Sequence, residues 1–351
     1  MLVTQQPVLR RFWYPILPME QLLKTPASFT LLGEKLVVWR DQAGQPAVLR
    51  DRCCHRSAQL SLGQIKDGSI RCPYHGWAFD AAGTCVHVPQ LPTDGAISAS
   101  YQVKAYSCVE RYGYIWVCLA DEPLQEIPEI PEASEADFRL IHEFYEPWEC
   151  AGLRVMENEM DMAHPAYVHP TTFGSEAYPT PDEMELKETE WGINYRSVLK
   201  VVNPDLQKQN LKMAQDQTVR TMTMRWFMPF TVKLRIDYPN GLSHVIVNTM
   251  TPISDGTSQM VQFCLRNDTE AEVKANDVIA FDRAVTLEDK RILETTDYDV
   301  PLSLGHEQHM ATDKPGILMR KKMAALLKAH GESEQTRHRS REAAFPTMQL
   351  V

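Results

Sequence analysis

The sequence predicts an α+β protein, in which a small all-β domain precedes a larger domain built on an antiparallel sheet. Three observations carry this prediction. The chain has 351 residues, too many for one ordinary domain of ~100–200 residues and enough for two. Short runs rich in Val, Leu and aromatic residues fill the first part of the chain. Alternating runs flanked by helical patterns follow a proline-rich acidic segment.

The first domain is expected over residues 1–120. Residues 29–49 contain two β-rich runs, FTLLGEKLVVW and PAVL, on either side of a turn at Asp41 to Gly44, which predicts a hairpin. Glycines and prolines punctuate the chain beyond it. Further short strands are expected at residues 69–71 and 112–119.

A linker is expected at residues 121–137, because this segment holds three prolines and seven acidic residues. The second domain is expected over residues 138–330, followed by a flexible tail at 331–351. Its strands are predicted at residues 218–228, 230–238, 243–251 and 258–266. The turn Pro239-Asn240-Gly241 joins two of them, which favours antiparallel pairing. Helices are predicted at residues 153–168, 273–296 and 314–330.

Charge and hydropathy exclude some classes of function. The formal net charge is -10, with no segregated basic patch, so nucleic-acid binding is not expected. No run of ~20 apolar residues predicts a membrane span. Arg10 and Arg11 could begin a twin-arginine signal, but Pro15, Pro18 and Glu20 interrupt the segment behind them. A cytoplasmic location is therefore expected, and the eight cysteines are too few for a disulfide scaffold.

Four metal-ligand side chains form the first functional motif. Cys53 and His55 are followed after sixteen residues by Cys72 and His75, giving C-x-H-x16-C-x2-H. This is the ligand set of a Rieske [2Fe-2S] cluster, in which two thiolates hold one iron and two imidazoles hold the other. A zinc site is the alternative, but zinc motifs usually place two cysteines together and two histidines together. The mixed pairs favour the cluster.

At these residues the sequence resembles the Rieske oxygenase family. The stretch DRCCHRSAQLSLGQIKDGSIRCPYHGWAFDAAGTC is similar to the family's C-P-H-R and C-P-Y-H-G-W segments. Cys54 stands where the family usually has proline, and whether it has any role stays open. High-potential Rieske proteins resemble this pattern but carry two extra loop cysteines, at positions occupied here by Ala58 and Tyr74. The resemblance thus implies a low-potential cluster that relays electrons to a second centre.

The second motif, MENEMDMAHPAYVHP, resembles the mononuclear-iron motif of the same family. Asn158, Asp161, His164 and His169 stand in it as N-x2-D-x2-H-x4-H. The resemblance implies that both histidines bind Fe(II) in a 2-His-1-carboxylate triad that leaves room for dioxygen and substrate. Asp161 and His164 share a helix face, so the carboxylate can orient the imidazole. Asp161 and Asn158 are the candidate catalytic residues.

The resemblance places the carboxylate ligand of the iron in a segment similar to E-D-K. Residues 287–294, LEDKRILE, supply Asp289 at the position of the family's aspartate. E-D-K is also common on exposed helices. Competing acids are Glu288, Asp282 and Glu294.

The resemblance also implies an architecture and an assembly. A helix-grip (START-like) catalytic domain would follow the Rieske domain, and three chains would form a head-to-tail homotrimer. Asp161 would then connect His164 with the partner subunit's His75. No G-x-G-x-x-G follows a predicted strand, so electrons are expected from a separate ferredoxin or flavin reductase, with NAD(P)H used only indirectly.

The expected activity is oxygenation of a small, mainly apolar organic molecule, by hydroxylation or oxidative demethylation. Mono- and dioxygenation, the substrate and the reductase stay open. Candidate cavity residues are Met224, Trp226, Leu234, Ile236, Asn248 and Met250. Two alternatives remain: an electron-carrying Rieske ferredoxin, and a metal-free START-like protein that binds a small molecule or lipid.

Overall fold

The computed structural model describes residues 1–23, 25–92 and 95–337, and this part of the chain forms two compact units. The N-terminal unit consists of residues 9–129 and 251–254. The C-terminal unit consists of residues 1–8, 130–250 and the described residues from 255 onward. The division at 129/130 falls inside the segment expected to be a linker. The first eight residues belong to the C-terminal unit rather than to the domain they precede.

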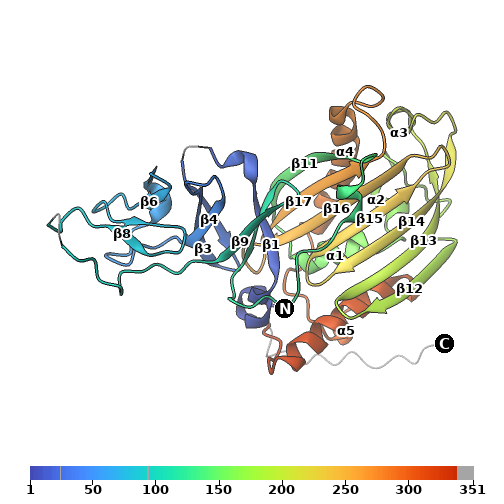
Figure 1. The fold of residues 1–351 in the computed structure, drawn as a ribbon. Helices are drawn as coiled ribbons and strands as arrows, with labels where there is room; N and C mark the ends of the chain where they lie inside the picture. Colours follow the sequence, from blue (N-terminus) through green and yellow to red (C-terminus); the bar gives the residue numbers. More distant parts are fainter. Residues whose placement is uncertain (24, 93–94, 338–351) are drawn as a thin grey trace. The chain divides into compact units, whose positions relative to one another are not determined.

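Three small antiparallel sheets build the N-terminal unit (Figure 1). Their orders are β1-β10-β9, β2-β3-β4 and β5-β6-β7-β8. The strands are β1 (Trp13–Pro18), β2 (Ala27–Leu31), β3 (Glu34–Arg40), β4 (Pro46–Arg50), β5 (Gln64–Lys66), β6 (Ser69–Arg71), β7 (Ala78–Phe79), β8 (Cys85–His87), β9 (Ser107–Arg111) and β10 (Tyr114–Cys118).

The predicted hairpin is present as β3 and β4, but its first run is two strands rather than one. Leu32 and Gly33 have φ values of 49° and 76°, which turn the chain between β2 and β3. Gly33 reaches this region without the steric cost of a Cβ. At the predicted turn, the Asp41 carboxylate accepts hydrogen bonds from the amides of Ala43 and Gln45, both at 2.9 Å. The core of this unit includes Trp39 together with two buried cysteines described below.

A seven-stranded antiparallel sheet forms the C-terminal unit, in the order β11-β17-β16-β15-β14-β13-β12. The four predicted strands are present within one or two residues of the expected bounds, as β14 to β17. Sequence patterns did not indicate the other three. The strands are β11 (Arg139–Trp148), β12 (Glu183–Thr189), β13 (Gly192–Val202), β14 (Gln217–Phe227), β15 (Thr231–Asp237), β16 (Ser243–Pro252) and β17 (Ser258–Arg266).

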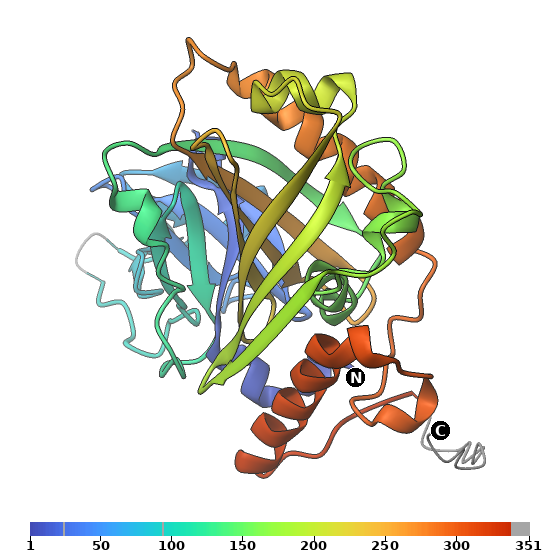
Figure 2. The ribbon, with the colours of Figure 1, turned by 90° about the vertical axis from the view of Figure 1, so that its right-hand side faces the viewer.

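The helices of this unit are α1 (Gly152–Glu159), α2 (Pro165–Val168), α3 (Asp205–Leu211), α4 (Ala275–Leu293) and α5 (Lys314–Ala329). Figure 2 shows α4, in orange, on one face of the sheet, and α5, in red, beside the edge strands. α1 packs on β15. The approach is close at Gly152, where an added Cβ would lie only 3.2–3.3 Å from Met250 and Phe230. The expected α+β class with a large antiparallel sheet is confirmed.

The prediction of one helix over residues 153–168 is wrong. α1 ends at Glu159, and a non-helical segment separates it from the single turn of α2. Pro165 begins α2, and a proline cannot donate the backbone hydrogen bond that would continue the earlier helix. Asp161 and His164 of the second motif lie in this non-helical segment, whereas Asn158 lies in α1.

Glu132 ties the acidic segment to the sheet. Its carboxylate is nearly buried and accepts hydrogen bonds from the Lys233 ammonium at 2.6 and 2.7 Å and from Arg235 at 3.3 Å. Burial alone would raise the pKa of Glu132, but these cations lower it below its ordinary value. This part of the expected linker is therefore a packed element of the C-terminal unit.

The described part of the expected tail is also held in place. The amide of Val8 donates to Glu332 at 2.7 Å, and the amide of Leu302 donates to Glu334 at 2.9 Å. Residues 338–351 lie outside the described residues. Among the described residues, no helix combines the length and apolarity that crossing a membrane requires.

Candidate metal centres and substrate cavity

Two loops of the N-terminal unit present Cys53 and Cys72 in the same local conformation. In each loop the amide four residues after the cysteine donates to the cysteine carbonyl, from Ser57 at 3.0 Å and from Gly76 at 3.1 Å. Both of these residues have positive φ values, 60° and 78°. The repeated turn lets each loop offer a thiol and an imidazole to the same point. Both thiols are buried and unpaired by disulfides.

The two imidazoles lie against each other. The ring centroids of His55 and His75 are 4.5 Å apart, and His55 stacks on Trp77 at 4.5 Å with the planes nearly parallel. The Gln90 side chain connects Trp77 with the His75 backbone, because its oxygen accepts from the Trp77 indole at 3.1 Å and its nitrogen donates to the His75 carbonyl at 2.9 Å. Ring packing and the Gln90 hydrogen bonds thus position both imidazoles.

The chemistry of these groups fits a metal cluster. Burial raises the pKa of Cys53 to about 12, so this thiol would stay protonated at neutral pH unless a cation were bound beside it. Burial and the nearby His75 lower the pKa of His55, which keeps the imidazole in the neutral form that binds metals. The Nδ1 atom of His55 is buried without a hydrogen-bond partner. An orphaned imidazole nitrogen in such a place fits a ligand atom.

Three side chains of the second motif and α4 converge in the C-terminal unit. The Nε2 atoms of His164 and His169 are 3.3 Å apart, and Asp289 Oδ1 lies 3.5 and 3.3 Å from them. Ligand atoms ~2.1 Å from one metal ion and at right angles about it lie roughly 3 Å apart. His164 and His169 flank the single turn of α2 as its N-cap and C-cap. The backbone of His169 leaves the helical conformation there (φ -109°, ψ 43°), whereas a continuous helix would turn the two histidines to different faces.

The other acids near these histidines approach different atoms. Glu288 Oε2 lies 3.0 Å from His169 Nδ1 and also accepts a hydrogen bond from the Thr172 hydroxyl at 2.8 Å. Glu294 instead accepts from the amide of Glu149 at 3.0 Å. Glu288 therefore orients the ring of His169 from behind, in the way a carboxylate supports a ligating histidine.

Asn158 and Asp161 flank the three converging side chains. The Asn158 amide donates to Asp289 Oδ1 at 3.0 Å. Asp161 accepts from the amides of Ala163 at 2.8 Å and His164 at 3.2 Å, and its Oδ2 lies 3.5 Å from His164 Nδ1. Asp161 approaches the back of the His164 ring, as Glu288 does for the other histidine.

Electrostatics favour an ionised Asp289. Burial by itself would raise the pKa of this carboxyl, but its contacts with His169 and His164 lower the pKa below the ordinary value. A metal ligand must be deprotonated, so this is the protonation state that binding requires.

Comparisons with known proteins identify the family. The Rieske [2Fe-2S] domain family matches residues 12–107. The family of the vanillate O-demethylase oxygenase C-terminal domain matches residues 148–329, more than half of the chain. The chain belongs to the Rieske oxygenases. The expected enzyme class and cofactors, a [2Fe-2S] cluster and a mononuclear iron, are confirmed, and neither alternative function is favoured.

Relatives of this oxygenase match along almost its whole length. Methylxanthine N1-demethylase NdmA of Pseudomonas putida is 29% identical over 338 residues, covering 93% of this chain and 92% of that protein. The solved structure of Pseudomonas putida CBB5 NdmA with caffeine has a TM-score of 0.80 and 27% identity, covering 94% of each chain. Dicamba monooxygenase bound to 3,6 dichlorosalicylic acid, at 24% identity and a TM-score of 0.78, shows the fold alone. The oxygenase accordingly acts on a small organic molecule with O2 and electron-transfer partners.

A cavity of about 100 Å³ lies beside the converging histidines, between α1, α4 and the sheet. Leu234, Ile236 and Asn248, which the sequence suggested as cavity residues, line it. Met224, Trp226 and Met250 do not line it, although they are wholly buried. Its remaining lining includes the apolar or aromatic residues Met162, Phe173, Leu199, Met222, Tyr238, Ile246, Phe281 and Val285.

A polar cluster that no sequence spacing indicated lies at this cavity, and it includes Asp282, one of the acids that competed with Asp289 as an iron ligand. His244 and Asp282 line the cavity, 3.2 Å apart, and metal-capable atoms of Glu143 and Cys264 complete a group within 4.8 Å. Burial, reinforced by the nearby Asp282, raises the pKa of Glu143 well above its ordinary value. The protonated form of Glu143 is favoured in this cluster. One half-buried and three buried residues that are far apart in the sequence leave no local spacing signal.

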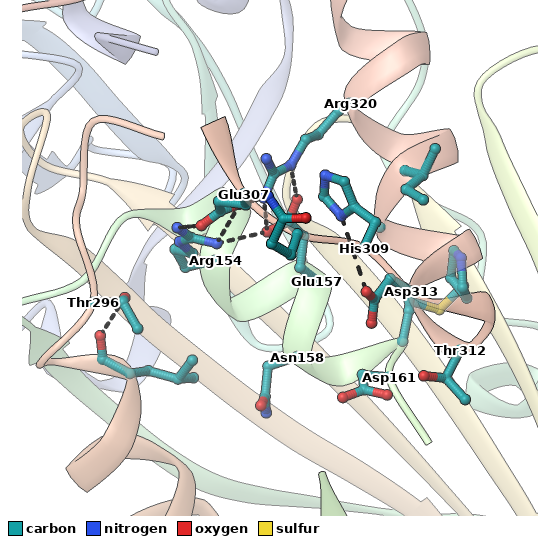
Figure 3. A pocket seen from close by; sticks show the side chains of 16 residues that line it. Arg154, Glu157, Asn158, Asp161, Thr296, Glu307, His309, Thr312, Asp313 and Arg320 are labelled. Atoms are coloured by element: carbon teal, nitrogen blue, oxygen red, sulfur yellow. Dashed lines mark hydrogen bonds and ion pairs between the residues drawn. The ribbon is translucent and has the colours of Figure 1, made fainter. Parts of the chain in front are cut away.

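A separate depression of about 320 Å³ opens on the other side of α1 (Figure 3). Arg154 and Arg320 cross-link Glu157 and Glu307 there, which joins α1 to α5. Asp161 lines this depression, and its side chain remains 29% exposed. Asp161 thus contacts His164 and at the same time faces a surface hollow.

Proposed function

We propose that Cys53, His55, Cys72 and His75 hold the Rieske cluster of this oxygenase, and that His164, His169 and Asp289 hold its mononuclear iron. The observation that carries the second assignment is the 3.3–3.5 Å triangle formed by two Nε2 atoms and one carboxylate oxygen. Bound iron would supply the activation of dioxygen, with electrons delivered from the cluster. The reaction is hydroxylation or oxidative demethylation of a mainly apolar substrate.

The residues around the proposed iron site have defined tasks. Asp289 contributes the negative charge, and Asn158 fixes the carboxylate by donating to Oδ1. Glu288 and Asp161 orient the two imidazoles from their Nδ1 sides, at 3.0 and 3.5 Å. The largely apolar cavity lining limits the water that reaches the reacting carbon.

We propose a homotrimer, in which each cluster delivers its electron to the iron of the adjacent subunit. Two features support this assembly. Tyr74, next to His75, is 66% exposed, so the tip of the cluster loop is available for docking. Asp161 faces a surface depression while it contacts His164. The partner subunit's His75 would approach Asp161 from this depression. The cytoplasmic location expected from the sequence is part of the same proposal, and cell fractionation tests it.

Turnover with a surrogate reductase tests the proposed activity. A panel of small aromatic and alicyclic compounds is screened for substrate-dependent consumption of both NADH and O2. We expect at least one compound to yield a product that contains ¹⁸O from ¹⁸O2, or to release formaldehyde. NADH consumption that never depends on an added compound, in protein that holds both iron centres, would contradict the proposal.

A further inference from the structure

Arg220 occupies a position in β14 where the strand pattern calls for an apolar residue. Residues on one face of this strand alternate with outward residues such as Val219, which is 48% exposed. Arg220 is in phase with Met222, Met224 and Trp226, which are all buried. Its guanidinium lines the cavity, with only 3% of the residue exposed. A permanent positive charge therefore lies on the buried face of the sheet, at the wall of the cavity.

This charge has no anionic partner in the part of the chain that the structure describes. The Nε and Nη2 atoms of Arg220 are buried without a hydrogen-bond acceptor, and among the described residues no carboxylate oxygen lies within 4.0 Å of the guanidinium. Arg266 provides the contrast within the same sheet. It is also fully buried, but its guanidinium donates to Asp268 and Asn210, both at 2.6 Å. Burial of an arginine without an anion is costly, so an unpaired one indicates that a ligand supplies the anion.

Aromatic side chains connect Arg220 with the proposed iron site. Its guanidinium carbon lies 4.7 Å from the centre of the Phe173 ring and 5.6 Å from that of Tyr238. The Phe173 ring also stacks on His169 at 4.9 Å. One aromatic ring therefore contacts both the guanidinium and a proposed iron ligand, and all four residues line one cavity.

The acidic groups of the cavity have other partners. Asp282 lies 3.2 Å from His244, and Asp289 lies among the two iron-site histidines. Glu159 accepts a hydrogen bond from the Asn248 amide at 2.7 Å. The aromatic contacts of Arg220 are favourable but weaker than an ion pair, so they do not replace an anion.

We propose that Arg220 binds the carboxylate of the substrate, so that the oxygenase acts on a small organic acid with an apolar body. This inference rests on the proposed function of the cavity as the substrate site. The planar guanidinium matches a carboxylate with two parallel hydrogen bonds, which fixes direction as well as position. A molecule held at this end extends past Phe173 toward His169, and this orientation presents its apolar part for oxidation. A neutral analogue of the same shape leaves Arg220 unpaired and binds weakly.

Binding of benzoate and of its neutral isostere benzamide to the iron-loaded protein, measured by calorimetry, tests the inference. We expect benzoate to bind the wild type at least about 30-fold more tightly than benzamide. Arg220→Gln should abolish this preference. Arg220→Lys should keep part of it, because the lysine ammonium retains the charge but cannot donate two parallel hydrogen bonds to one carboxylate. Arg225→Gln is the matched control, since Arg225 lies on the exposed face of the same strand. Direct coordination of benzoate to iron would not depend on Arg220.

Thermal stability provides a second readout. Removing an unpaired buried charge relieves its burial cost, so Arg220→Gln without ligand is expected to melt no lower than the wild type, whereas a structural arginine would lower the midpoint. Benzoate raises the midpoint of the wild type and of Arg225→Gln, but not of Arg220→Gln.

Equal affinity for benzoate and benzamide, no binding of benzoate at millimolar concentrations, or retained benzoate affinity in Arg220→Gln would each overturn the inference. None of these results depends on turnover. Missing iron or absent oxygenase activity would refute the proposed function by separate measurements.

Discussion

Asp289 and Glu288 are neighbours in α4, yet their carboxylates approach different nitrogens of the histidines. Asp289 lies against both Nε2 atoms, and Glu288 lies against the Nδ1 of His169. We therefore expect Asp289→Ala to lose the mononuclear iron, whereas Glu288→Gln keeps it with about 10–100-fold weaker affinity. Metal analysis of both variants, with the Rieske spectrum as a control for folding, distinguishes them. Retained iron in Asp289→Ala together with lost iron in Glu288→Gln would reverse the assignment.

Replacement of Asp161 separates two roles of its carboxylate, the proposed transfer of the electron between the centres and the orientation of His164. Asp161→Asn keeps the size but removes the charge and one acceptor beside His164, whose Nδ1 lies 3.5 Å from the carboxylate. If Asp161 lies on the path between the centres, both centres assemble and reoxidation of the reduced cluster by O2 with substrate slows by ~100-fold or more. If Asp161 only orients His164, the variant loses iron instead. Wild-type reoxidation in Asp161→Ala would exclude both roles.

At the residue scale, the sequence was informative where the proposed ligands cluster in short motifs and uninformative about polar residues that are far apart in the chain. Each proposed set of histidine ligands stands in one short motif, from Cys53 to His75 and from Asn158 to His169, so these motifs predicted the metal sites. Arg220 was recognisable in principle as a charge in phase with three apolar residues of a predicted strand. His244 and Asp282 were not, because one residue lies in a strand and the other in a helix, and no spacing connects them.

Glu132 connects the acidic segment to β15 through its ion pairs with Lys233 and Arg235. Its replacement tests how much this connection stabilises the fold. Because Lys233 and Arg235 would lose their common partner, we expect Glu132→Gln to lower the free energy of unfolding by about 2–4 kcal/mol at pH 7. Glu135→Gln, in the same segment but exposed, is the control and should change little. Urea denaturation measures both.

The pH dependence of this difference follows from the sign of the pKa shift. The pKa of Glu132 is lower in the folded protein than its ordinary value of about 4.3, so the ion pairs stabilise fully above that value. Their contribution is lost as the pH falls through the depressed folded value. The wild type and Glu132→Gln should therefore converge in stability on acidification, and a difference that stays constant down to pH ~2 would contradict the ion-pair account.

At the element scale, periodicity located the strands with strong alternation and the long helices, but missed β11 to β13. β12 reads EMELKET and lies at the edge of the sheet, where half-exposed residues give little hydrophobic signal. The helix expected over residues 153–168 shows the opposite failure. Apolar spacing continued through the break, and only Pro165 and Pro170 indicated that the chain would leave the helix.

For the whole molecule, the proposed trimer makes a prediction about size. Sedimentation equilibrium of the iron-loaded protein should give a mass of three chains, because the proposed electron path places the partner's cluster next to Asp161. A fully active monomer would contradict the proposed path of the electron, since each chain would then have to connect its own two centres.

The central claim is that one chain holds a Rieske cluster and a separate mononuclear iron on different residues. The most direct measurement is the iron content of the wild type and of His169→Ala, taken together with the electron paramagnetic resonance spectrum after dithionite reduction. We expect three irons per chain in the wild type, two in the variant, and the same Rieske signal in both. Three irons in the variant, or loss of the Rieske signal along with the iron, would contradict the claim.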